Sequence, residues 1–152
     1  MTSPYLFRPK QVGASLVLNA LTKSIGGHGN ALGGSLTDTG QFDWTRYPNI
    51  ADNYKRFAPA QWGIAQLRAK ALRDFGGALG PEAAHHLAVG SETMALRIER
   101  ESASALALSR MLSEDPRVAA VHYPGLTAHP QHRLATELFR AYGGLFSFEL
   151  KD

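Results

Sequence analysis

A single lysine, Lys23, lies between an apolar run and a glycine-rich turn in the stretch ALTKSIGGHGN, residues 20–30. A lysine amine becomes a nucleophile toward a carbonyl group when its position is fixed and partial burial or neighbouring cations favour its neutral form. Thr22 adds a hydroxyl, and glycines let the backbone approach an anion closely. Together these features suit a phosphorylated aldehyde, although a solvated surface lysine is the commoner use of such a residue.

Two apolar runs bracket Lys23, and both are predicted to be strands. Residues 14–20 (ASLVLNA) have the composition of a strand buried on both faces. Residues 31–37 (ALGGSLT) form the second predicted strand, which a turn at 38–40 closes. We therefore expect Lys23 directly after a buried strand that fixes its backbone.

Helices dominate the middle of the predicted chain. After an aromatic-rich surface loop at 41–59, a helix is expected at 61–75. A second, at 81–89, begins with Pro81 and ends at Gly90, because proline is tolerated at the first helical position. A long helix then runs from Ser91 until Asp115-Pro116 stops it. Its apolar stripe consists of Met94, Ile98, Ala105, Leu108 and Leu112.

The last part of the chain is predicted to alternate strand, helix and strand. Strands are expected at 118–123 and 145–150, and a helix at 130 to about 142. The complete order of elements indicates an α/β chain. Because the sequence stops shortly after an apolar strand, we expect it to be a fragment of a larger protein.

Composition limits the class of protein further. The chain has 152 residues and a net charge of +3, but its basic residues are scattered, so no nucleic-acid partner is expected. It has no cysteine, which excludes disulfide scaffolds and thiolate zinc sites. No signal-peptide core and no run of about 18 apolar residues is present, so no membrane partner is expected and the predicted location is cytoplasmic.

Other candidate sites have simpler structural explanations. The GGHGN turn lacks the frame of a nucleotide-binding loop. His122, His129 and His132 could share a metal, but without a carboxylate at ligand spacing a turn and a helix start are the favoured interpretation, and no metal is predicted. His85 and His86 point to different helix faces and cannot chelate together. No serine stands in a GxSxG frame.

The loop aromatics have two possible uses. They could line the mouth of a substrate site, but packing against the domain is the commoner use of aromatic side chains in a loop. These residues are Phe42, Trp44, Tyr47, Tyr54, Phe57 and Trp62.

Long stretches of the sequence resemble one enzyme family. The run SLVLNALTKSIGGHGNALGGSLTDTGQFDW is similar to the cofactor-lysine segment of the Cys/Met-metabolism pyridoxal-phosphate (PLP) enzymes, most of all O-acetylhomoserine sulfhydrylases and cystathionine γ-synthases. The likeness extends to TSPYLFRP upstream and to FGGALGPEAAHHLAVGSETMALRIER, VAAVHYPGLTAHPQHRLA and GGLFSFEL downstream. It therefore covers nearly the whole chain in family order.

The resemblance implies PLP as cofactor, with Lys23 as the Schiff-base lysine and proton shuttle and Thr22 as a cofactor-phosphate contact. The sequence departs from the family where Ala20 replaces a phosphate-binding serine, where Gly80 replaces a serine, and where Ser24 replaces an aromatic residue. The family's ring-stacking aromatic, ring-nitrogen aspartate and carboxylate-binding arginine have no counterpart in this chain.

The implied fold is part of a fold-type-I PLP-dependent transferase. Residues 1–80 would be the C-terminal part of the large PLP domain, 81–115 connecting helices, and 116–152 the start of the small domain. The implied reaction is γ-replacement on an O-acylated homoserine in methionine biosynthesis and transsulfuration. The alternatives are a γ-lyase, against which GGHG and FDW argue mildly, and a catalytically incompetent truncated chain. The implied partners are a small amino-acid substrate and further copies in a homotetramer.

Overall fold

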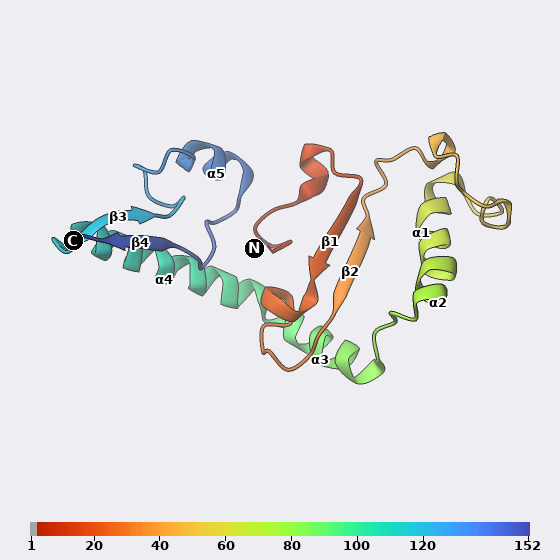
Figure 1. Ribbon diagram of the computed structural model, residues 1–152, viewed down its shortest axis with the longest axis horizontal. Coiled ribbons are helices and arrows are strands. Elements are labelled where there is room, and N and C mark those ends of the chain that lie inside the picture. The colour runs from red at the N-terminus through yellow and green to blue at the C-terminus, as the bar shows by residue number, and fades with distance from the viewer. Residues whose placement is uncertain (1–2) are drawn as a thin grey trace. The chain divides into compact units, whose positions relative to one another are not determined.

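Two antiparallel strand pairs and several helices make up the chain, whose computed structural model describes residues 3–152 (Figure 1). The contacts divide it into two units. One is Pro9–Val89, and the other combines Gly90–Asp152 with the described residues up to Arg8. Among the described residues, no helix is long and apolar enough to cross a membrane.

The first strand pair confirms the two predicted strands next to Lys23. After the 3-10 turn η1, Pro9–Val12, strand β1 is Leu16–Ala20 and pairs antiparallel with β2, Gly34–Asp38. The prediction that β1 is buried on both faces is wrong, because Leu18 is 79% exposed. Within the described part of the chain the sheet has only these two strands, and the Leu18 side chain is left exposed on one of its faces.

The aromatic loop folds into short helical turns around a small core. The turns are η3, Trp44–Arg46, η4, Asp52–Tyr54, and η5, Pro59–Gln61. Trp44, Ile50 and Tyr54 are buried together, and Trp62 packs against them. Burial of Trp44 and Tyr54 confirms that loop aromatics pack against the domain, whereas Phe42, Tyr47 and Phe57 remain about 40% exposed.

A single helical run follows this loop, as predicted. It consists of α1, Trp62–Gln66, a π-helical turn η6, Leu67–Ala71, and α2, Leu72–Phe75. It ends at Gly76, whose φ of +66° is the left-handed conformation that glycine adopts readily at helix ends.

The next two helices differ from the prediction at their junction. Helix α3 is Pro81–Glu92 and α4 is Met94–Glu114. The predicted end of α3 at Gly90 is wrong, because the helix continues through this glycine and breaks at Thr93. An internal glycine costs a helix only about 1 kcal/mol. Here the Gly90 carbonyl also accepts a hydrogen bond from Arg97 Nη2 at 2.9 Å.

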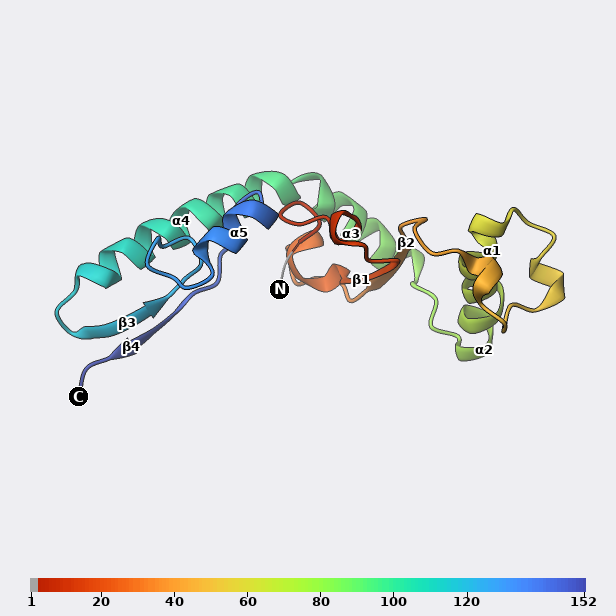
Figure 2. The ribbon, with the colours of Figure 1, turned by 90° about the horizontal axis from the view of Figure 1, so that it is seen from above.

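The second strand pair lies along α4 (Figure 2). Strand β3, Val118–His122, pairs antiparallel with β4, Ser147–Leu150, with a register shift between Val118 and Ala120. The buried side chains of α4 are Ile98, Ser102, Ala105 and Ser109. Of the predicted stripe, Ile98 and Ala105 are therefore confirmed as packed, Met94 and Leu112 are half-buried, and Leu108 is 46% exposed.

The intervening helix α5, His132–Leu138, is shorter than predicted. Phe139 is already extended, with φ −110° and ψ 144°. Its ring packs against Phe7 at a centroid distance of 5.2 Å, and the Arg140 N–H donates to the Leu6 carbonyl at 2.9 Å. These contacts with the N-terminal segment hold residues 139–140 outside the helix.

Candidate active site

Lys23 lies at a kink directly after β1. The residues Leu21–Ile25 form a π-helical turn, η2, in which Lys23 departs from helical geometry with φ −89° and ψ −123°. Two hydrogen bonds close the turn, from the Gly26 N–H to the Leu21 carbonyl at 2.8 Å and from the Gly27 N–H to the Lys23 carbonyl at 2.7 Å. The backbone of Lys23 is therefore fixed while its side chain is exposed.

The Lys23 amine is available for chemistry. Among the described residues it has neither a hydrogen-bond partner nor an ion-pair partner. A lysine fixed through its backbone at the end of a strand presents its amine from a defined point, which is what nucleophilic attack on a carbonyl requires. The predicted position of Lys23 directly after the strand is confirmed by these bounds.

Thr22 holds the start of the second strand segment to the end of the first. The Gly33 N–H donates to Thr22 Oγ1 at 3.1 Å, and the Leu21 N–H donates to the Gly33 carbonyl at 2.8 Å. The Thr22 hydroxyl is 3.4 Å from that same carbonyl. The Thr22 hydroxyl oxygen thus accepts a hydrogen bond from the Gly33 N–H. The O–H of the same hydroxyl has only a long contact to the Gly33 carbonyl, which already accepts a bond from the Leu21 N–H.

This arrangement fits a phosphate-bearing cofactor. A hydroxyl has one donor and two acceptor lone pairs, so Thr22 can keep its bond from Gly33 and turn its O–H toward an anionic oxygen. A bond from a neutral donor to a charged acceptor is stronger than the 3.4 Å contact that it replaces. The amine of Lys23 and the hydroxyl of Thr22 belong to consecutive residues, so both can serve one small ligand.

The glycine turn after Lys23 is shaped by its histidine. Gly27 and Gly29 have φ of +72° and +66°, which favour glycine. Between them, His28 Nδ1 lies 2.7 Å from the Gly26 carbonyl. Because a carbonyl only accepts, Nδ1 carries the proton and donates, and this bond ties the turn to the end of η2.

Ala20 is half-buried at the end of β1, opposite Gly34. Its side chain has no hydroxyl, so the polar contact to an anion that the resemblance places here is missing.

The three histidines that were considered as metal ligands have separate hydrogen-bond partners. His122 Nε2 lies 2.8 Å from Glu149 Oε1, and His132 Nδ1 lies 2.7 Å from the Pro124 carbonyl. His129 Nδ1 accepts from the Gln131 N–H at 3.1 Å. Across residues 3–152 no group of three potential metal-ligating side chains comes together.

His85 and His86 do not act as a pair either. Their ring centroids are 6.0 Å apart at an interplanar angle of 53°, and His86 Nε2 lies 3.9 Å from Glu82 Oε1, one turn earlier on α3.

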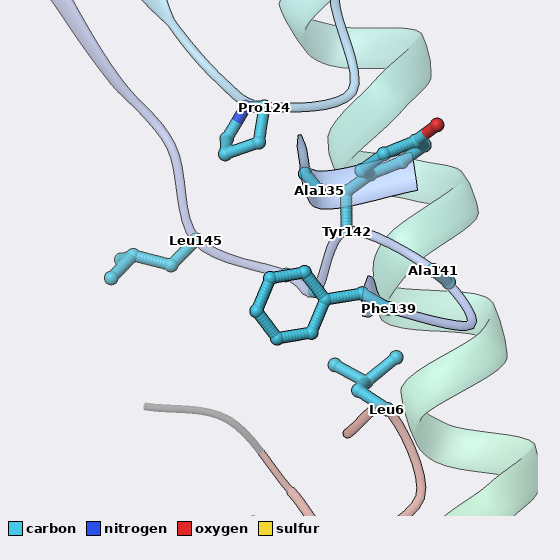
Figure 3. Close-up of a pocket in the computed structure, with 9 residues that line it drawn as sticks. Leu6, Pro124, Ala135, Phe139, Ala141, Tyr142 and Leu145 are labelled. Atoms are coloured by element: carbon cyan, nitrogen blue, oxygen red, sulfur yellow. The ribbon is translucent and has the colours of Figure 1, made fainter. Parts of the chain in front are cut away.

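An apolar cavity of about 230 Å³ lies in the unit that contains β3 and β4 (Figure 3). Leu6 and Phe139 lie next to each other in its lining, which Leu145, Pro124 and Tyr142 extend. Sequence reasoning missed this cavity, because its walls come from segments far apart in the chain. It has no charged side chain in its lining, so it offers no acid, base or anion contact for the chemistry of Lys23.

The marked pKa shifts also lie outside the Lys23 turn. Burial raises the pKa of Tyr123, whose hydroxyl donates to the Gly143 carbonyl at 2.7 Å. Hydrogen bonds from Arg117 lower the pKa of Asp115 from 3.8 to about 2. Both groups lie in the unit that contains β3 and β4.

The residues and the fold together define a class of protein. The chain belongs to the Cys/Met metabolism PLP-dependent enzyme family, which it matches over residues 1–152. Its structure is part of the PLP-dependent transferase fold, which confirms the predicted fold class and the cofactor of the family.

Three known proteins are similar to this chain in sequence. The chain is 40% identical over 158 residues to O-acetyl-L-homoserine sulfhydrylase 1 of Thermus thermophilus, covering 97% of this chain and 38% of that protein. It is 37% identical over 161 residues to homocysteine/cysteine synthase of Saccharomyces cerevisiae, covering 97% and 36%. It is also 32% identical over 150 residues to L-methionine gamma-lyase of Fusobacterium nucleatum, covering 98% and 33%.

A solved structure agrees with these relatives. The O-acetylhomoserine sulfhydrylase of the methionine biosynthetic pathway of Wolinella succinogenes superimposes with a TM-score of 0.90 at 34% identity, covering 100% of this chain and 43% of that one. The chain therefore spans between a third and two fifths of the length of the curated relatives named above.

Proposed function

We propose that this chain carries the cofactor-binding lysine of an enzyme that replaces the γ-substituent of an O-acylated homoserine with a sulfur nucleophile. The observation that carries the proposal is the fixed backbone and exposed amine of Lys23 beside the available O–H of Thr22. The sulfhydrylases and homocysteine synthases among the relatives support the choice of reaction.

Lys23 has two roles in this proposal. Its Nζ would hold PLP through a covalent bond, and its amine, when free, would move protons at the substrate Cα and Cβ. Thr22 donates its O–H to the cofactor phosphate. PLP, when bound, withdraws electrons from the bonds at Cα and so makes these proton transfers possible.

The proposal extends to the organisation of the whole protein. We place residues 1–80 at the C-terminal part of the large cofactor domain, 81–115 in connecting helices and 116–152 at the start of the small domain. We also propose that the whole protein is a homotetramer, that it is cytoplasmic, and that its substrate is a small amino acid. Because the relatives are more than twice as long, the remaining cofactor and substrate contacts belong to parts of such an enzyme outside this chain.

The second candidate is a γ-elimination. The relative named L-methionine gamma-lyase is the observation that favours it. Elimination expels the acyloxy group as a carboxylate and, with uptake of water, gives a keto acid and ammonia. It needs no sulfur nucleophile, whereas replacement requires one. Incubating O-acetyl- and O-succinylhomoserine with the assembled enzyme, with and without sulfide or a thiol, separates these reactions.

Reductive labelling tests the role of Lys23. The 152-residue chain is mixed with PLP and treated with borohydride, which makes the covalent link irreversible, and the labelled peptide is mapped. We expect saturable label on Lys23 that Lys23→Ala abolishes and that Lys70→Ala, an exposed lysine on the helical run after the aromatic loop, leaves unchanged. Label spread over surface lysines, or no label, would contradict a cofactor site in this chain and favour the catalytically incompetent alternative.

A further inference from the structure

We propose that Leu87 is a positioning residue that holds the Lys23 turn in place, an inference that rests on the proposed function of Lys23 and Thr22. Leu87 lies on α3 and is only 5% exposed. Its two terminal methyl groups contact two different backbone segments on either side of the turn.

The contacts of Leu87 with the two segments are seen from the space that a side chain at Gly26 or Gly33 would occupy. A Cβ at Gly33 would lie 2.6 Å from Leu87 Cδ1, and a Cβ at Gly26 would lie 2.6 Å from Leu87 Cδ2. Distances this short are not tolerated between carbon atoms in packed interiors. One leucine side chain therefore fills the space between the two segments, and glycine at both positions creates that space.

Both glycines control the residues proposed to do chemistry. Gly33 bonds the Thr22 hydroxyl through its N–H and the Leu21 N–H through its carbonyl. Gly26 closes η2 through its bond to the Leu21 carbonyl. A shift of either segment thus moves the hydroxyl of Thr22 and the kink at Lys23. Leu87 acts through these backbone bonds and needs no contact with the cofactor.

The two glycines differ in a way that makes the inference testable. At Gly33 the other neighbours of a Cβ are side chains at 3.4 Å or more, so shortening Leu87 makes room for alanine. At Gly26 the Cβ would also lie 2.9 Å from the Leu21 carbonyl oxygen, which shortening Leu87 leaves in place. Leu87→Ala should therefore rescue Gly33→Ala and fail to rescue Gly26→Ala.

Amide hydrogen exchange on the 152-residue chain measures the backbone directly. The reporters are the amides of Leu21, Gly26 and Gly33, whose hydrogen bonds define the turn. We expect Leu87→Ala to speed their exchange at least about tenfold, because a leucine-to-alanine cavity destabilises what packs around it. Leu87→Met, which keeps the volume, should leave exchange within about threefold of the original chain.

The double variant Leu87→Ala with Gly33→Ala should recover most of the protection that either single variant loses. Leu87→Ala with Gly26→Ala should recover none. The matched control is Ile98→Ala on α4, which removes a side chain that is 2% exposed in the other unit and should leave these three amides unchanged.

Borohydride labelling of Lys23 with PLP provides the second measurement. If the original chain takes label at Lys23, Leu87→Ala should lose about tenfold in PLP affinity and the Gly33 double variant should regain it. Equal affinity in Leu87→Ala overturns the positioning role. Absence of label in the original chain overturns the proposed function instead, and the exchange data then still decide whether Leu87 holds the turn.

Unchanged exchange in Leu87→Ala, or equal rescue of both glycine variants, overturns the inference in either case. If Leu87→Ala unfolds the chain, the single variant Gly33→Ala and the conservative Leu87→Met keep the test decisive. We expect the amide of residue 33 to exchange fast in Gly33→Ala and to stay protected in Leu87→Met.

Discussion

The Thr22 hydroxyl stabilises the fold and, in the proposed function, also contacts the cofactor. Its acceptor side is used by the Gly33 N–H, which ties β2 to the end of β1, and its donor side has only a 3.4 Å contact. The same position without a hydroxyl would lose both functions. Ala20, two residues earlier, is the opposite case, because it keeps the strand pairing with Gly34 and offers no polar contact.

Restoring a hydroxyl at Ala20 should strengthen cofactor binding. A hydrogen bond to a charged group contributes roughly 1.5–3 kcal/mol, so Ala20→Ser should lower the Kd for PLP by about tenfold to hundredfold. Spectroscopic titration of the chain with PLP measures this constant. Ala120→Ser, the same change on β3, is the control and should leave the Kd unaltered. A Kd that Ala20→Ser does not change would mean that residue 20 does not face the phosphate.

Asp115 couples stability to pH at the end of α4. Hydrogen bonds from Arg117, the largest cause, hold the pKa of Asp115 below its usual 3.8, at about 2. A carboxyl whose folded pKa is depressed contributes stability above the unfolded pKa and loses it as pH falls through the folded one. The contribution is therefore complete above about pH 5 and disappears as pH falls toward 2.

Asp115→Asn tests this window. The urea midpoint of the variant should lie below that of the original chain at neutral pH, and the two should converge as pH falls from about 4 to 2. Glu114→Gln, a neutralisation at the adjacent exposed residue, controls for net charge. A difference in midpoints that persists undiminished at pH 2 would contradict the role of the Asp115–Arg117 bonds.

At the scale of elements, the small aromatic core depends on one glycine. Gly63 on α1 lies under Trp44, and a Cβ there would be 2.2 Å from Trp44 Cζ2. The indole is also held by its own bond from Nε1 to Asp38 Oδ2 at 2.8 Å, so it cannot shift freely. Helix propensity favours alanine over glycine by about 1 kcal/mol, but a clash with a fixed ring outweighs it.

Gly63→Ala should therefore destabilise the chain by roughly 1–3 kcal/mol, as overpacked core variants do. Chemical denaturation followed by tryptophan fluorescence measures the change near Trp44. Gly77→Ala is the matched control, because a Cβ there meets nothing within 4 Å. If Gly63→Ala is as stable as the original chain, Trp44 has room to move and does not pack as described.

The elements also show what the sequence could and could not predict. Apolar runs, with proline or glycine at their ends, predicted both strand pairs and most helices, because these signals are local. The predicted ends of α3 and α5 were wrong. The Arg97 side chain donates to the Gly90 carbonyl and the Arg140 N–H donates to the Leu6 carbonyl, and hydrophobic periodicity does not encode these contacts. The proposed site residues Lys23 and Thr22 were predicted from residue type and resemblance. The proposed positioning residue Leu87 was not predicted, because it contacts two glycines more than fifty residues away in the sequence.

For the whole molecule, the first strand pair leaves an apolar face uncovered. Leu18 is 79% exposed and lies opposite Leu36, which is 36% exposed, and Leu16 on the same face is 37% exposed. Among the described residues neither β1 nor β2 has a further strand beside it. Isolated two-stranded sheets with open edges and an apolar face are prone to pair with other chains.

We therefore expect the 152-residue chain to associate in a concentration-dependent way through this face. Light scattering after size-exclusion chromatography should give a mass that rises with concentration, and Leu18→Lys should lower it, because a charge on the contact face opposes association. Thr37→Lys is the matched control. It adds the same charge to the other face of the sheet, since Thr37 pairs with Val17, and it should leave the mass unchanged. If both lysine variants reduce the mass equally, net charge governs association. A constant mass of about 16.5 kDa in the original chain would mean that this face does not bind a second copy.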